Sequence, residues 1–156
     1  MIEEFFLPQR HHPSSQVLWR HPCKLKTWPL SAGIPGVIKL NVDAATTNTT
    51  SWLPVVARDG DGNLLRWWAK YISLCDPLIA ETSTVLWAIQ LALSKHFHTV
   101  IIEGDSQICM DSLNGKSYFG SWLISSLSND ILVSCKRFRF GKSCPTDSWF
   151  GSLLHM

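Results

Sequence analysis

The chain has 156 residues, the length of one domain with some residues left over, and 46% of them are apolar, enough for a substantial core. Its net charge of +2 is far below that of proteins that coat DNA through charge alone, so any contact with nucleic acid must be local. No apolar run approaches the roughly 18 residues of a membrane span, so we expect no membrane partner. The five cysteines contain no CxxC pair, which favours free thiols in a reducing, intracellular compartment over a disulfide framework or a zinc site.

Residues 1–35 hold five of the eight prolines and show little periodicity. Prolines at such density interrupt helices and strands. We therefore predict an irregular N-terminal arm or linker at 1–35 and a folded domain at 36–156.

Three strands are predicted next. Residues 37–42 alternate between apolar and polar side chains, as a half-buried strand does. Residues 52–57 form a second strand, in which Pro54 suggests an edge position or a bulge. The Asp- and Gly-rich residues 59–63 are typical of a turn, so 52–57 and the strand at 64–72 are predicted to form a hairpin.

Alternation along the third strand assigns its two tryptophans to opposite faces. One face carries Leu65, Trp67, Ala69 and Tyr71, and the other carries Arg66, Trp68 and Lys70. The first set is more apolar, so Trp67 is predicted to lie in the core and Trp68 to be partly exposed.

Helices and strands alternate over the rest of the chain. Asp76 followed by Pro77 is typical of a helix start, and residues 78–95 have helical spacing, with Glu81 and Val85 on one face. The remaining predicted elements are a strand at 100–103, a helix at 106–113, a helix at 119–132 and a fifth strand at 136–140. A hairpin meander followed by alternating strands and helices predicts a mixed α/β sheet.

Three acidic residues stand out because each adjoins an apolar element. Asp43 ends the first strand, Glu81 lies on the apolar face of a helix, and Asp105 follows the strand at 100–103. Carboxylates near a core need a partner or a metal ion. If the three converge, they indicate divalent cations and phosphate chemistry.

The residues around these acids resemble the RNase H type 1 superfamily, in particular plant domains related to non-LTR retrotransposon reverse transcriptases. The similarity covers about residues 28–135. The matching pieces, in order, are Trp28-Pro29 before residues 36–45, Val56-Ala57-Arg58-Asp59 with Gly62, Ala80-Glu81 with Ala88, and Glu103-Gly104-Asp105-Ser106.

This resemblance implies a five-stranded mixed sheet, a three-stranded antiparallel meander plus parallel strands, flanked by helices. It implies cleavage of the RNA strand of RNA–DNA hybrids with two Mg²⁺ ions, or Mn²⁺, held by Asp43, Glu81 and Asp105. Apart from the resemblance, we expect a monomer. Mg²⁺ prefers hard oxygen ligands and retains waters, so few carboxylates suffice. The 2′-hydroxyl would distinguish RNA from DNA.

The C-terminal part departs from the family pattern. A fourth acid would fall in residues 142–149, where Trp149 takes the matching position and Asp147 lies two residues before it, so Asp147 is a further candidate ligand. The last helix of the family is short or missing. The alternative function is therefore a catalytically impaired nucleic-acid-binding or interaction module derived from a retroelement.

Four more residues are candidate contacts to nucleic acid: Asn41, Arg137, Arg139 and Lys142. The three basic side chains could follow phosphates. A solvated strand face is the alternative for them.

Overall fold

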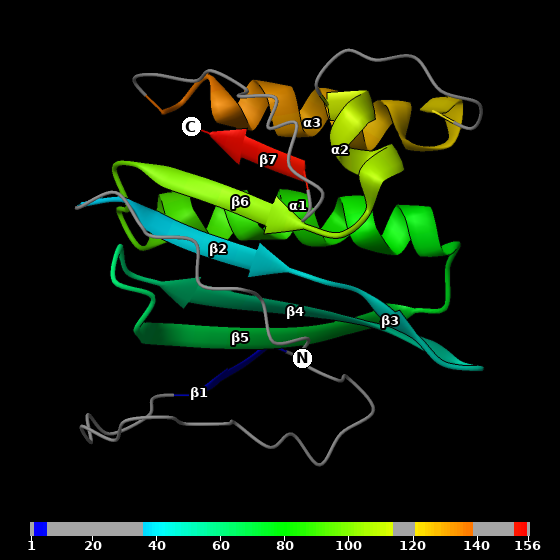
Figure 1. Ribbon diagram of the computed structural model, residues 1–156. Coiled ribbons are helices and arrows are strands. Elements are labelled where there is room, and N and C mark those ends of the chain that lie inside the picture. The colour runs from blue at the N-terminus through cyan, green and yellow to red at the C-terminus, as the bar shows by residue number, and fades with distance from the viewer. Residues whose placement is uncertain (1, 6–35, 114–120, 139–151, 156) are drawn as a thin grey trace.

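The computed structural model describes residues 2–5, 36–113, 121–138 and 152–155. A mixed sheet with the strand order β1-β5-β4-β2-β6-β7 runs through the molecule, and a short strand, β3, pairs with β4 beside this path. In Figure 1 helix α1 crosses behind the sheet, while α2 and α3 lie above it.

Four of the predicted strands are present and form the centre of the sheet. They are β2 (Ile38–Val42), β4 (Thr50–Arg58), β5 (Leu64–Ser73) and β6 (Val100–Gly104). β2, β4 and β5 make the antiparallel meander, and β6 pairs with β2 in parallel. The predicted class of mixed sheet is confirmed.

The predicted turn between β4 and β5 is organised by Asp59. Its Oδ1 accepts hydrogen bonds from the backbone N–H groups of Asp61, at 3.0 Å, and Asn63, at 2.8 Å. Hydrogen bonds to its carboxylate, the side chain of Asn63 first, hold the pKa of Asp59 below its ordinary value. This local network explains why the hairpin was readable from sequence.

Pro54 does not occupy an edge or a bulge, because β4 lies between β5 and β2 and its register shift falls at Ala57/Arg58. On the β2 side, pairing is interrupted between Val42↔Val55 and the Ala45↔Trp52 pair of β3 (Ala45–Thr46). Pro54 lies in that interruption, so its missing N–H removes no ladder hydrogen bond on the β2 side of β4.

Besides the short strand β3, two further strands were not predicted. β1 (Ile2–Phe5) lies within the segment expected to be irregular and pairs antiparallel with Trp67–Lys70 of β5. β7 (Ser152–His155) pairs antiparallel with β6. Both strands form by backbone pairing with a strand that is distant in the sequence. Such pairing produces no clear pattern in a short sequence window.

The fifth strand predicted at 136–140 is wrong for the residues that the structure describes. The backbone N–H groups of Lys136, Arg137 and Phe138 instead donate to carbonyls of the last turn of α3, at 3.4, 3.1 and 3.0 Å. A helix end leaves carbonyls without partners, and these turns satisfy them. Residues 139 and 140, and the final helix considered from the sequence, lie outside the described residues.

The predicted helices are present as α1 (Pro77–Ser94), α2 (Gln107–Leu113) and, for the third, a 3-10 turn η1 (Ser121–Ile124) leading into α3 (Ser125–Cys135). The core lies where α1 packs on the sheet, with Leu40, Val55, Ala88 and Ile102 fully buried. None of the helices in the described parts of the chain combines the length and apolar character that crossing a membrane requires.

The predicted faces of β5 are reversed: Trp68 is 1% exposed and lies in the core, whereas Trp67 is half-buried. Trp68 pairs with Val55 of β4, and cross-strand partners share a face. Val55 packs into the α1 side of the sheet, so register places Trp68 there too. The more apolar character of the other face of β5 did not decide its orientation.

Candidate metal centre

Asp43 lies at the interruption between β2 and β3. The ladder of β2 ends at Val42, and the Asp43 carboxylate is half-buried, with Oδ1 accepting a hydrogen bond of 2.8 Å from the backbone N–H of Ala44. Asp43 therefore follows the last paired residue of β2, at the end of the strand.

Asp105 follows β6 directly and is exposed. β2 and β6 are parallel, so their carboxyl ends reach the same edge of the sheet. The preceding residue, Gly104, lets the strands approach closely, since a Cβ there would lie 3.0 Å from Cγ2 of Val42. The sequence thus brings Asp43 and Asp105 side by side.

Glu81 comes from α1 and is half-buried. The side chain of Asp76 caps the helix by accepting from the N–H of Leu78 at 2.8 Å, and Pro77 begins it, as predicted. Glu81 is the fifth residue of the helix, beyond the first turn, so the helix dipole is not the reason for an acid here.

The three acids converge. Asp43, Glu81 and Asp105 each offer a carboxylate oxygen within 4.8 Å of the others. Ligands on opposite sides of a Mg²⁺ ion lie about 4.2 Å apart, since each bond is about 2.1 Å. No two ligands of one ion lie farther apart than this, so the 4.8 Å limit on the three acids is close to the span of a single ion, and their all-oxygen donor set fits a divalent cation.

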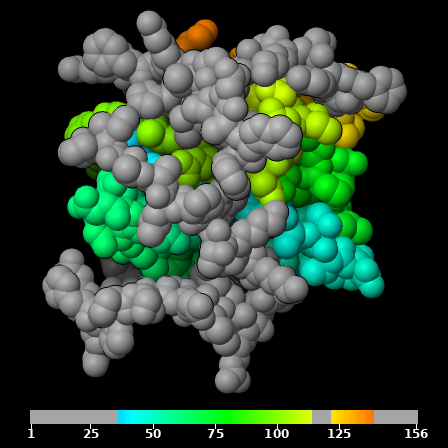
Figure 2. All heavy atoms as spheres, in the orientation of Figure 1, coloured from blue at the N-terminus to red at the C-terminus, as the bar shows by residue number. Residues whose placement is uncertain are grey.

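Figure 2 shows the surface at this edge of the molecule. Atoms of the β2–β3 region (cyan), α1 (green) and the β6–α2 region (yellow-green) meet on the right-hand side of the view. Three segments far apart in sequence therefore contribute to one part of the surface.

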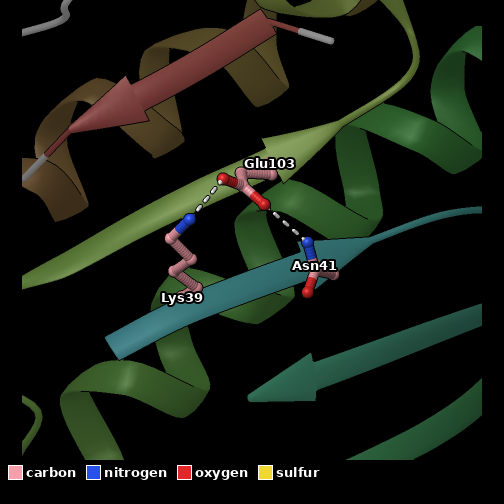
Figure 3. A network of polar contacts seen from close by, with 3 residues as sticks. All are labelled: Lys39, Asn41 and Glu103. Carbon is pink, nitrogen blue, oxygen red and sulfur yellow. Dashed lines mark hydrogen bonds and ion pairs between the residues drawn. The ribbon is translucent and has the colours of Figure 1, made fainter. Parts of the chain in front are cut away.

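Behind the acids, three polar side chains form a network between β2 and β6 (Figure 3). Nδ2 of Asn41 donates to Oε2 of Glu103 at 2.8 Å, and Nζ of Lys39 lies 3.4 Å from Oε1 of Glu103. Lys39 and Asn41 are buried, with exposures of 8% and 6%. From the sequence, Glu103 was indicated only as a neighbour of Asp105. Lys39 and Asn41 alternate with apolar residues along the strand, and this alternation was the only sequence pattern that placed them on one face.

The remaining site residues predicted from the sequence do not join the three acids in the part of the chain that the structure describes. Asn41 is an internal contact rather than an exposed one. Arg137 is exposed in the turn after α3 and is not on a strand. Arg139, Lys142, Asp147 and Trp149 lie outside the described residues.

Cys109 of α2 lies close to Glu81, which the sequence did not indicate. Its thiol is 1% exposed and accepts a hydrogen bond of 3.4 Å from Oγ1 of Thr82. Burial raises the pKa of Cys109 to about 11, the charge of Glu81 adds to that rise, and the Thr82 hydrogen bond opposes it. The thiol is therefore neutral at ordinary pH.

Comparisons with known proteins bear on the family and the fold of the chain. A family model described as reverse transcriptase-like matches residues 41–142, more than half of the chain. A search of curated proteins found no match.

Several solved structures similar to the chain are ribonucleases H. RNase H1 from Halobacterium salinarum is 19% identical with a TM-score of 0.61, covering 65% of this chain and 79% of its own. The RNase H domain of a Mycobacterium tuberculosis protein is 15% identical with a TM-score of 0.57, covering 66% and 76%. LC11-RNase H1, solved in complex with an RNA/DNA hybrid, is 17% identical with a TM-score of 0.58, covering 65% and 78%. At these identities the likeness shows a shared RNase H-like fold.

Proposed function

The chain belongs to the reverse transcriptase-like family, and from this membership and its converging acids we propose that it is a metal-dependent endonuclease that hydrolyses the RNA strand of RNA–DNA hybrids. The observation that carries the proposal is the placement of Asp43, Glu81 and Asp105 within 4.8 Å on an RNase H-like fold. One structural relative, LC11-RNase H1, was solved with an RNA/DNA hybrid, which supports the substrate class.

Each acid has a defined part in this proposal. Asp43, Glu81 and Asp105 would hold two Mg²⁺ ions, or Mn²⁺, through carboxylate oxygens. When bound, the ions would supply Lewis-acid activation of water and stabilisation of charge on the phosphodiester. The carboxylates fix the position of this chemistry at the sheet edge, and the 2′-hydroxyl next to the cleaved bond would select RNA.

A cleavage assay tests the proposal directly. The full chain with Mg²⁺ should nick the labelled RNA strand of a hybrid and spare duplex DNA. Asp43→Asn should reduce the rate more than about 100-fold, because an amide is a poor ligand for Mg²⁺ and even outer partners of metal ligands are worth about 10–100-fold. The matched control is Asp130→Asn, an equal change of charge on the exposed surface of α3, which should leave the rate unchanged.

The competing function is a binding module without turnover. It predicts hybrid binding that weakens as salt rises, together with no metal-dependent cleavage by folded protein. Folded wild-type protein that binds the hybrid but leaves its RNA intact would favour the module and contradict the nuclease.

A further inference from the structure

The strands that carry two of the acids are joined by a side-chain hydrogen bond at the last pair of their ladder. Asn41 and Glu103 are Cα partners in the parallel β2–β6 pairing, and Nδ2 of Asn41 donates to Oε2 of Glu103 at 2.8 Å (Figure 3). Asp43 lies two residues beyond Asn41, and Asp105 lies two residues beyond Glu103. The hydrogen bond therefore fixes the spacing of the strands just before the acids leave them.

Lys39 completes this group, which we name the interstrand cluster: Lys39, Asn41 and Glu103. Its Nζ lies 3.4 Å from Oε1 of Glu103, so a positive charge offsets the carboxylate that lies two residues before Asp105. Glu103 then adds no unbalanced negative charge beside Asp105. This matters because the carboxylates of the three acids already repel one another.

The fold alone does not require polar side chains at these positions. Val56, the cross-strand partner of Asn41, and Ile101, the partner of Lys39, are apolar and buried on the same face of the sheet. Among the described residues, Oδ1 of Asn41 is buried and has no hydrogen-bond partner, which is unfavourable for stability. Replacing a buried ion pair by apolar residues is often neutral or stabilising, which favours a role other than stability for this polar group.

We propose that the interstrand cluster positions Asp43 and Asp105 for divalent cations. This inference rests on the proposed metal centre. Lys39, Asn41 and Glu103 act as positioning residues: they hold the ends of β2 and β6 at the separation that the carboxylates need. Gly104 serves the same close approach from the backbone.

Metal affinity, measured beside folding stability, separates positioning from a purely structural role. Binding of Mn²⁺ to the full chain is measured by calorimetry and by electron paramagnetic resonance, with urea unfolding of each variant. The triple variant Lys39→Met, Asn41→Val, Glu103→Ile replaces the polar group by apolar side chains. We expect it to unfold at the same or a higher urea concentration while its Mn²⁺ affinity falls about 10–100-fold. A merely structural group would change both quantities together or neither.

A single variant keeps the test decisive if the triple variant does not fold. Asn41→Leu breaks the interstrand hydrogen bond, removes the unsatisfied oxygen and leaves the Lys39–Glu103 pair, and should lower Mn²⁺ affinity about tenfold. The matched control is Lys70→Met, which removes a lysine of the same sheet that lies 4.6 Å over the ring of Trp87. That control should leave Mn²⁺ affinity unchanged.

The positioning role would be overturned if the Asn41→Leu variant or the triple variant folds and binds Mn²⁺ with an affinity within about twofold of that of the wild type. Wild-type protein that binds no Mn²⁺ would overturn it as well, since no cation would then be positioned. Wild-type protein that binds Mn²⁺, loses affinity in both variants and still cleaves no hybrid would support the inference and contradict the nuclease.

Discussion

Single residues decide how closely β2 and β6 approach beside the acids. Gly104 has no Cβ, Val42 fills the space against it, and Asn41 bonds across to Glu103. These contacts are close and few, so changes of one or two atoms should be measurable in stability.

Gly104→Ala should lower the free energy of unfolding by about 1–3 kcal/mol, because the new Cβ would lie 3.0 Å from Cγ2 of Val42. Val42→Ala should relieve this contact, so the double variant should lose less stability than the sum of the single variants, by at least about 0.5 kcal/mol.

Urea unfolding of this double-mutant cycle provides the measurement. Gly36→Ala is the matched control: its φ of +79° disfavours alanine, but no atom of the described residues lies within 4 Å of the added Cβ. It should therefore be additive with Val42→Ala. Additivity in the Gly104 cycle would contradict the close contact.

Cys109 should make stability depend on alkaline pH. Burial, the main cause, raises its pKa from 9.0 to about 11 in the folded protein. The unfolded chain loses this proton first as pH rises, so the contribution of Cys109 is fully present below pH 9 and is lost between pH 9 and about 11. The loss is on the order of 2–3 kcal/mol, as expected for about two pKa units.

The measurement is metal-free urea unfolding of wild type and Cys109→Ala at several pH values from 7.5 upward. The stability difference between the two proteins isolates Cys109 from other titrating groups, including Cys135, whose pKa burial also raises to about 11. The difference should shrink above pH 9, and a difference that does not change with pH would contradict the raised pKa.

At the scale of elements, α1 connects the core to the candidate metal centre. Its inner side, which includes Val85 and Ala88, is buried against the sheet, and Glu81 near its start reaches the acids. The start of the helix is therefore set by local capping, and its position is set by packing.

Asp76→Ala should destabilise the protein by about 1 kcal/mol, because it removes the side-chain acceptor for the N–H of Leu78. Asp76→Asn keeps an acceptor oxygen and should retain most of the stability. Denaturant unfolding at neutral pH measures both variants. Equal losses for the two would show that charge, rather than the cap hydrogen bond, is what matters.

On the scale of the whole molecule, the described core is contained within one stretch of chain. Every buried apolar residue among those described lies between Val37 and Phe138. From the first 35 residues the structure describes β1, which covers the outer edge of β5 through Trp67–Lys70. The N-terminal strand thus extends the sheet at the edge of β5.

A chain of residues 36–156 should therefore fold with a circular dichroism spectrum close to that of the full chain. Without β1, the edge of β5 has unpaired backbone groups, which favours association between molecules. Sedimentation should show concentration-dependent association of the shorter chain, with the full chain as control. An unfolded shorter chain would show that residues 1–35 are part of the folding unit.

The sequence alone predicted the features that depend on residues close together in the chain. The Asp76–Pro77 helix start, the Asp59 turn and the alternation of β2 and β6 all depend on groups a few residues apart. The order of the elements and the spacing around Asp43, Glu81 and Asp105 then indicated the fold and the acids that converge.

Only the tertiary structure decided which faces and partners these elements use. Trp68 rather than Trp67 enters the core because register with Val55 turns it toward α1. β1 joins the sheet through backbone pairing, and Asn41 is buried because Glu103, 62 residues away, accepts its hydrogen bond. Such choices depend on contacts between distant segments, whose free energy no local pattern contains.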